Sequence, residues 1–156
     1  MIVKAYFKRH PDSIDGLFTL QTNKRELFTR IPARSGQKGY ENEEWVRGKG
    51  PVPKGKYHLW LHLQKPNPMF PDKPDGIGEF YQISSAKDNQ RLIQDPTTPH
   101  RQRWDIGLHP ENAYPGSAGC IVLLHNEDWL QAYVAGLFEF LRWYGKKHRT
   151  IELEVL

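Results

Sequence analysis

Cysteine is nearly absent from this chain of 156 residues, which has a single one, Cys120. One cysteine cannot form an internal disulfide, so the thiol needs another explanation. An inert buried residue is one interpretation, because free cysteine is among the residue types most often buried. A chain of this length buries about two thirds of its unfolded surface, so we expect one domain, residues 1–156, that folds without a metal or a disulfide.

Long hydrophobic runs are also missing. No stretch approaches the roughly 18 apolar residues that a membrane-spanning helix requires. The N-terminal segment, residues 1–9, has neither an apolar core of about seven residues nor a small-residue cleavage site, so it does not resemble a secretory signal. We therefore expect synthesis in the cytoplasm, and delivery by another route if the protein acts in the periplasm or on the cell wall.

Neither sign of charge dominates the composition. The chain has 22 Lys and Arg against 18 Asp and Glu, which gives a formal net charge of +4 with histidine neutral. The basic residues are scattered, with no run of five or more, and this argues against a nucleic-acid partner. Diffuse positive charge suits an anionic polymer such as a cell-wall glycan-peptide, and it equally suits ordinary solubility.

The hydrophobic pattern predicts a mainly β domain with one long helix. Apolar and polar residues alternate near the N-terminus, as in a half-buried strand, and turn residues 22–24 between two apolar runs predict a hairpin. Strands are predicted at 3–7, 16–20, 26–31, 56–63, 80–83, 103–108, 121–124 and 150–156.

Residues 126–144 have apolar side chains at helical spacing. Asn126 is the expected N-cap of this helix, and Gly145 is its expected C-terminal stop. Residues 65–78 contain four prolines, which cannot join the interior of a sheet. This segment is expected to be a connecting loop or a surface flap over a cleft.

The residues around Cys120 favour a reactive thiol. Ser117, Ala118 and Gly119 have little bulk, so the backbone can turn sharply there and direct its amides at whatever approaches the sulfur. The thiolate is the nucleophile, and a neighbouring base must generate it because a free cysteine has a pKa of about 8.5. His109 follows a predicted strand and begins the loop that returns at Ser117, which would put both side chains at one edge of a sheet.

These residues resemble the catalytic domain of L,D-transpeptidases, the YkuD-like family. That family carries a histidine, a spacer and then Ser/Thr-x-Gly-Cys, and His109, Ser117, Gly119 and Cys120 stand in those places. Upstream, residues 27–36 are similar to the family's strand-turn-strand that ends in Ser/Thr-Gly, and residues 51–57 are similar to its TPxGxY element. The resemblance implies a β-sandwich of mixed sheets with one long helix.

The sequence departs from the family pattern at three points. The spacing from histidine to cysteine is short, Ala118 stands where a second histidine is common, and Val122 stands where Arg or Asn is common. The amino-acid sequence around Cys120 is most similar to branches of the family found in phage-type proteins and secretion-system effectors.

The resemblance implies acyl transfer on the stem peptide of peptidoglycan. In the family, the cysteine attacks the carbonyl of the third residue of a tetrapeptide, expels D-alanine, and passes the acyl group to an amine or to water. By position, Cys120 is then the nucleophile, His109 the base and later the acid, the Gly119 and Cys120 amides the oxyanion donors, and Ser117 the residue that orients the turn. No cofactor is implied.

Further residues are candidates for the same site. Asp105 is a candidate for orienting the imidazole, although the family often uses a backbone carbonyl there. Trp104, Asn112 and Tyr114 lie close in sequence to the proposed centre and are candidates for substrate binding.

Alternatives remain open at the level of sequence. A domain that kept the fold and lost turnover would be a non-catalytic peptidoglycan-binding module. A metal site built on His58, His62, His109 and Glu111 lacks any recognisable ligand motif. Papain-like and NlpC-like peptidases place the cysteine before the histidine, the reverse of the order here.

The expected partner is the peptidoglycan stem peptide, and an effector role would add an immunity protein or a delivery machinery. Transpeptidation and hydrolysis both remain open, because they differ only in whether an amine or water accepts the acyl group.

Overall fold

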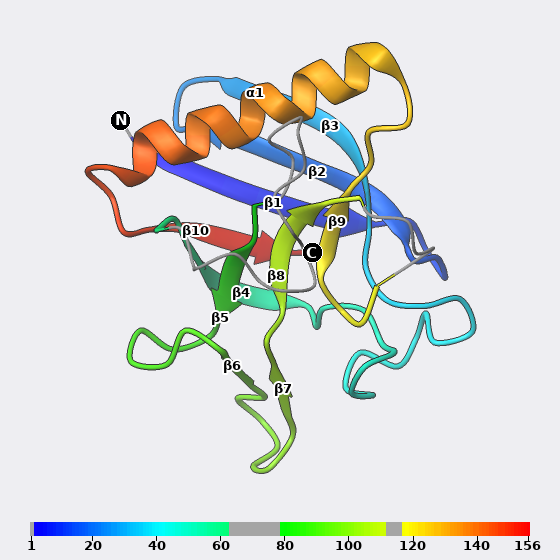
Figure 1. Cartoon of the computed structure of the whole chain (residues 1–156). Coiled ribbons are helices and arrows are strands. Elements are labelled where there is room, and N and C mark those ends of the chain that lie inside the picture. Colours follow the sequence, from blue (N-terminus) through cyan, green and yellow to red (C-terminus); the bar gives the residue numbers. More distant parts are fainter. Residues whose placement is uncertain (1, 63–78, 112–116) are drawn as a thin grey trace.

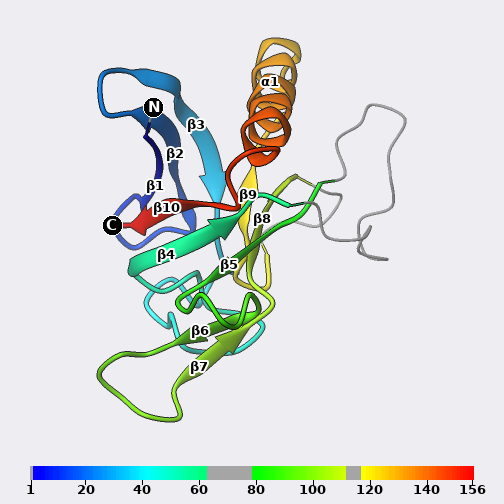
Figure 2. The same ribbon diagram turned by 90° about the vertical axis from the view of Figure 1, so that its left-hand side faces the viewer.

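The computed structural model describes residues 2–62, 79–111 and 117–156. Eight strands form a closed barrel in the order β1-β10-β4-β5-β8-β9-β3-β2, and β6 and β7 form a separate two-stranded sheet (Figures 1 and 2). The elements are β1 (Val3–Arg9), β2 (Asp15–Thr22), β3 (Glu26–Arg34), β4 (Gly55–Trp60), β5 (Tyr81–Ser84), β6 (Leu92–Gln94), β7 (Gln102–Trp104), β8 (Gly107–Pro110), β9 (Ile121–Leu123), α1 (Asp128–Gly145) and β10 (Thr150–Val155).

The N-terminal strands follow the alternation in the sequence. β1 and β2 pair antiparallel, with Ala5 opposite Leu20 and Phe7 opposite Phe18, and all four side chains are fully buried. Polar residues between them face outward, because successive side chains of a strand point to opposite faces of the sheet. The predicted hairpin of residues 16–31 is confirmed as the β2–β3 pair.

The final strand closes the barrel. β10 lies between β1, to which it is parallel, and β4, to which it is antiparallel. Its apolar residues Ile151, Leu153 and Val155 alternate into the core, as predicted for the C-terminal strand.

The predicted β-sandwich is wrong in one respect, because the strands form a single closed sheet. β9 pairs with β3 on one side and with β8 on the other, so the sheet runs continuously from the central strands to the N-terminal hairpin. Closure was not visible in the sequence, since alternation in a strand is the same in a barrel and in a sandwich.

The predicted strand 103–108 is two strands. Asp105 has a φ of 59°, in the left-handed region, and this residue separates β7 from β8. The break sends β7 into a hairpin with β6, which extends away from the barrel in both ribbon views, while β8 enters the barrel sheet (Figures 1 and 2).

Helix α1 lies across the barrel beside β3 and buries Leu130, Val134, Leu137, Phe138 and Leu141 (Figure 1). The predicted helix is confirmed, but its ends differ from expectation. Glu127, and not Asn126, is the N-cap, and it makes no side-chain capping bond.

Gly145 is the last helical residue, and its small size serves packing. A Cβ there would lie 2.8 Å from the backbone oxygen of Leu61, so only glycine lets the end of α1 approach the chain after β4 this closely. The proline-rich segment 65–78, the proposed flap, lies outside the described residues.

Candidate active site

The parallel pair β8–β9 places the predicted site residues. Leu108 pairs with Ile121 and His109 with Val122. Leu108 and Ile121 belong to the buried hydrophobic core, so alternation directs His109 and Cys120 to the opposite, outer face of this sheet. Strands about 4.8 Å apart with a rise of about 3.3 Å put diagonal neighbours such as Cys120 and His109 about 8 Å apart at Cα, within reach of side chains of this size.

Cys120 is partly buried, and backbone groups surround its sulfur. The Gly107 amide donates to Sγ at 3.4 Å, and the thiol donates to the Asp105 carbonyl at 3.9 Å. Burial raises the pKa of Cys120 to about 11, although the backbone amides of Gly107 and Cys120 and the positive charge of Arg103 act in the other direction. The thiol is therefore protonated at neutral pH in this resting structure.

Ser117 fixes the turn that precedes Cys120. Its hydroxyl donates to the Cys120 carbonyl at 2.7 Å and accepts the Gly119 amide at 3.2 Å. Gly119 has a φ of 118°, which favours glycine. The Gly119 amide is already bonded to the Ser117 hydroxyl, which argues against its predicted role as an oxyanion donor. The role of the Cys120 amide stays a prediction.

The segment after β3 holds the turn from the other side. Ser35 is fully buried, and its hydroxyl donates to the Gly119 carbonyl and accepts the Val52 amide, each at 2.8 Å. Gly36 and Ser117 exchange two further bonds: the Gly36 amide donates to Ser117 Oγ at 3.0 Å, and the Ser117 amide donates to the Gly36 carbonyl at 2.9 Å. Two segments about 80 residues apart are thus locked together at the thiol.

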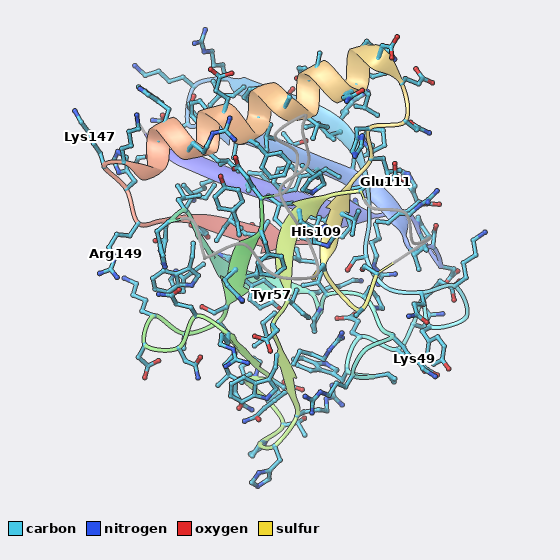
Figure 3. The ribbon with its side chains drawn as sticks, viewed as in Figure 1. Lys49, Tyr57, His109, Glu111, Lys147 and Arg149 are labelled. Carbon is cyan, nitrogen blue, oxygen red and sulfur yellow. The ribbon has the colours of Figure 1, made fainter. Side chains whose placement is uncertain are left out.

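His109 is 3% exposed and lies on β8 (Figure 3). Nδ1 lies 2.7 Å from the Pro110 carbonyl, and since a carbonyl only accepts, Nδ1 carries the proton and Nε2 the lone pair. The ring stacks on Phe80, with centroids 6.0 Å apart. Burial lowers the pKa of His109 to about 4, so the imidazole is neutral at pH 7.

Asp105 does not orient the imidazole. Its carboxylate forms a bidentate pair with Arg91, at 2.6 and 2.9 Å, and this pairing lowers its pKa. The Pro110 carbonyl occupies the position beside Nδ1 instead. The expectation for Asp105 is therefore wrong, because proximity in sequence did not reveal the turn at this residue.

The predicted substrate-binding residues are only partly described. Trp104 is 38% exposed and leaves β7 on the opposite side from its buried neighbour Arg103. Asn112 and Tyr114 lie outside the described residues. All three stay predictions.

Three residues that sequence reasoning missed contact the candidate site: Arg103, Gly107 and Phe80. A Cβ on Gly107 would lie 2.4 Å from Phe80 Cζ, so this glycine lets Phe80 lie close to β8, where it stacks on His109. A glycine two positions before a histidine in a strand was the available signal for this close approach. No pattern in the sequence pointed to Arg103.

The alternative metal site is not assembled in the part of the chain that the structure describes, where no group of three His, Cys, Asp or Glu residues could hold an ion. The Trp60 ring lies near both His58 and His62, with centroids 6.4 and 5.8 Å apart. Among the described residues, no helix is long and apolar enough to cross a membrane.

Comparison with known proteins gives one distant similarity. No protein-family model and no curated protein sequence matches this chain. Among solved structures, the chain is similar to the crystal structure of L,D-transpeptidase 1 from Mycobacterium tuberculosis, with 16% sequence identity and a TM-score of 0.41. The similarity covers 98% of this chain and 62% of that protein, so this chain spans less than two thirds of its length. A similarity this distant assigns neither a family nor an activity.

Proposed function

We propose that this protein is a cysteine acyltransferase that acts on peptidoglycan stem peptides. It is an L,D-transpeptidase if an amine accepts the acyl group, and an L,D-carboxypeptidase or endopeptidase if water does. The proposed chemistry rests on the β8–β9 register, from which alternation puts Cys120 and His109 on the same face of the sheet, and on the hydrogen bond between Nδ1 of His109 and the Pro110 carbonyl. The substrate class comes from the resemblance of the His109 and Ser117-x-Gly119-Cys120 pattern to the YkuD-like family.

The proposed reaction has two acyl transfers. Sγ of Cys120 attacks the carbonyl carbon of the third stem residue while Nε2 of His109 takes the thiol proton. The tetrahedral intermediate collapses, the bond to the terminal D-alanine breaks, and the imidazolium gives its proton to the leaving amine. An amine or water then attacks the thioester, loses a proton to His109, and releases Cys120 as the thiol.

The pKa values favour a neutral pair over a preformed ion pair. Burial raises the pKa of Cys120 to about 11 and lowers that of His109 to about 4, so a thiolate beside an imidazolium is the less stable arrangement at rest. His109 consequently acts as a general base during attack. The proton moves as the new carbon–sulfur bond forms.

The backbone would supply the electrostatic stabilisation. The Cys120 amide belongs to the turn that Ser117 and Ser35 hold rigid, and rigid donors stabilise the oxyanion of the intermediate without reorganising. Removing one such donor typically costs about 3 to 4 kcal/mol of transition-state stabilisation.

Mass spectrometry of the purified protein incubated with a peptidoglycan tetrapeptide tests this function. We expect release of D-alanine with a hydrolysed or cross-linked product, and a thioester adduct on Cys120 in the intact protein. Cys120→Ala should abolish all three species, and His109→Ala should reduce product formation by about 100-fold or more.

His10→Ala is the matched control, since His10 is exposed in the turn after β1 and should be replaceable without loss. Product formation by the Cys120→Ala protein would contradict the proposal. Binding of the tetrapeptide without any product would favour the alternative, a peptidoglycan-binding module that retains the fold.

A further inference from the structure

Arg103 is a buried cation at the candidate site. It lies in the middle of β7 between two exposed neighbours, and it is 1% exposed, among the largest fully buried side chains of the described residues. Burying a charge is costly unless the surroundings compensate for the lost water. The groups that stabilise the buried guanidinium therefore indicate what Arg103 does.

The guanidinium binds four backbone carbonyls from two segments. Nη1 donates to the carbonyls of Glu44 and Pro51, the latter at 3.1 Å, and Nη2 donates to those of Gly50 at 3.1 Å and Ala118 at 3.0 Å. Three of the carbonyls belong to the loop before β4, and the fourth belongs to the turn that precedes the thiol. Arg103 thus joins this loop to the turn, using the planar fork of donors that lysine lacks.

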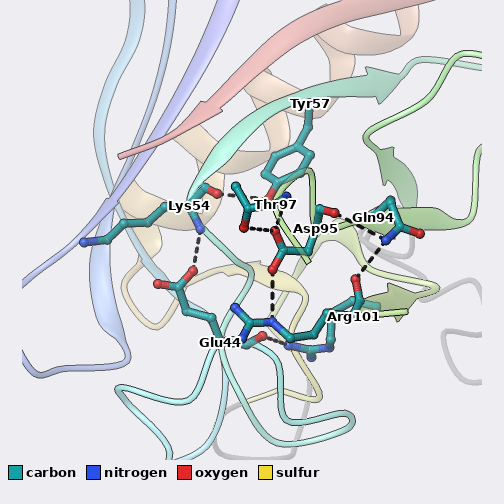
Figure 4. A network of polar contacts seen from close by, with 8 residues as sticks. Glu44, Lys54, Tyr57, Gln94, Asp95, Thr97 and Arg101 are labelled. Carbon is teal, nitrogen blue, oxygen red and sulfur yellow. Dashed lines mark hydrogen bonds and ion pairs between the residues drawn. The ribbon is translucent and has the colours of Figure 1, made fainter. Parts of the chain in front are cut away.

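These acceptors are neutral, so they satisfy the hydrogen bonds of Arg103 without cancelling its charge. In the part of the chain that the structure describes, no carboxylate lies within ion-pairing distance of Arg103. The carboxylates of the neighbouring polar network have other partners: Glu44 Oε2 accepts the Lys54 amide at 2.7 Å, and Asp95 pairs with Arg101 at 3.0 Å (Figure 4).

The charge lies next to the thiol. A Cβ on Gly119 would be 2.3 Å from Nη2, so the guanidinium packs directly against the residue before Cys120. Burial lowers the pKa of Arg103, and its interaction with Cys120 opposes this shift. In the same way, the positive charge of Arg103 opposes the rise in the pKa of Cys120 that burial causes.

We propose that Arg103 is a positioning residue that holds the turn before Cys120 and provides the buried positive charge that favours a negative charge on the sulfur. Two charged groups act on the thiol: Arg103 from β7 and Asp105 from the turn after it. The Asp105 carboxylate opposes the thiolate but is paired with Arg91, so the positive charge of Arg103 has the larger effect of the two. His109, on β8, is neutral.

Alkylation of the full chain by iodoacetamide over a range of pH, followed by intact-mass spectrometry, measures the pKa of the thiol. Two variants separate charge from hydrogen bonding: Arg103→Gln keeps amide donors without charge, and Arg103→Lys keeps charge without the fork. Arg103→Gln should raise the pKa of Cys120 by at least about one unit, which means about tenfold less thiolate at any pH below both values. Arg103→Lys should leave the pKa close to that of the wild type.

Turnover provides the second measurement. The rate of tetrapeptide conversion should fall in both variants, because neither side chain can bind all four carbonyls. Arg101→Gln, on the same β6–β7 hairpin, is the control and should change neither measurement. The inference rests on the proposed function only for turnover; alkylation needs no substrate, so an inactive wild type would refute that function and leave the role of Arg103 testable.

An unchanged alkylation profile in folded Arg103→Gln protein would overturn the inference, as would an equal shift in Arg103→Lys and Arg103→Gln. Thermal unfolding establishes whether each variant is folded. If Arg103→Gln does not fold, Arg103→Lys decides: an unchanged thiol pKa with slower turnover supports the inference, and a raised pKa refutes it.

Discussion

Replacing Ser35 with alanine removes a fully buried hydroxyl that joins the turn before Cys120 to the loop before β4. The substitution leaves the Gly119 carbonyl and the Val52 amide without this partner, and both bonds are 2.8 Å long. An unsatisfied buried group costs about 1–3 kcal/mol, so the two together should lower the free energy of unfolding by about 2–4 kcal/mol after the hydroxyl's own desolvation is subtracted. For a chain of this size, this corresponds to a Tm lower by roughly 5–12 °C.

Ser84 offers a matched control. It is also fully buried, and its hydroxyl accepts the Trp60 indole N–H at 2.9 Å and donates to the Ala86 carbonyl at 2.7 Å, away from the thiol. Calorimetry should show a similar loss of stability in Ser35→Ala and Ser84→Ala. Alkylation of Cys120 should change in Ser35→Ala alone, because only there is a bond to the turn lost. Equal alkylation rates in the two variants, or a Ser35→Ala protein as stable as the wild type, would refute the reasoning.

Three further predictions concern single residues. Because burial lowers the pKa of His109 from 6.5 to about 4, the unfolded chain binds a proton at a higher pH than the folded protein does. The free energy of unfolding should therefore fall by about 3 kcal/mol as the pH drops through this range. Denaturant unfolding at several pH values should show a weaker dependence of this free energy on pH in His109→Gln. Gly107→Ala should displace Phe80, whose Cζ would lie 2.4 Å from the new Cβ, and lower stability by about 1–3 kcal/mol in thermal unfolding; an unchanged Tm would contradict this. Gly145→Ala should destabilise the fold although alanine favours a helix by about 1 kcal/mol, because its Cβ would lie 2.8 Å from the Leu61 oxygen; a stabilised protein in urea unfolding would exclude that packing.

Elements with a strong periodic pattern were predictable from the sequence. The N-terminal hairpin, the C-terminal strand and the long helix were found within a few residues of their observed bounds, because amphipathic alternation reports which face is buried. Local departures from these periodic patterns were not predictable. Asp105 adopts a left-handed conformation that splits the strand predicted at 103–108, and Glu127 begins the helix without a side-chain cap, although Asn126 has the better capping chemistry.

For the candidate site, the sequence pointed to the residues proposed to react, and the structure showed which groups hold the turn before Cys120. His109, Ser117, Gly119 and Cys120 stood out because their chemistry and spacing are unusual. The contacts that hold that turn were not predictable. Ser35 fell within the element similar to the family's Ser/Thr-Gly, but its bond to Gly119 joins residues 84 positions apart. Arg103 gave no signal, because it acts through Ala118, which is 15 positions away.

The sequence by itself determined the N-terminal hairpin, the C-terminal strand, the single long helix, and the positions of the histidine and the cysteine before and after a small-residue turn. Tertiary structure decided that the strands close into a barrel, that β8 and β9 lie side by side and parallel, and that a buried guanidinium without a carboxylate partner among the described residues lies against the turn. The physical reason is the range of the interactions. Side-chain alternation and backbone preferences act over a few residues, so a short stretch of sequence predicts them. Strand pairing and buried hydrogen bonds join segments that are far apart in the sequence, and no short stretch predicts that they meet.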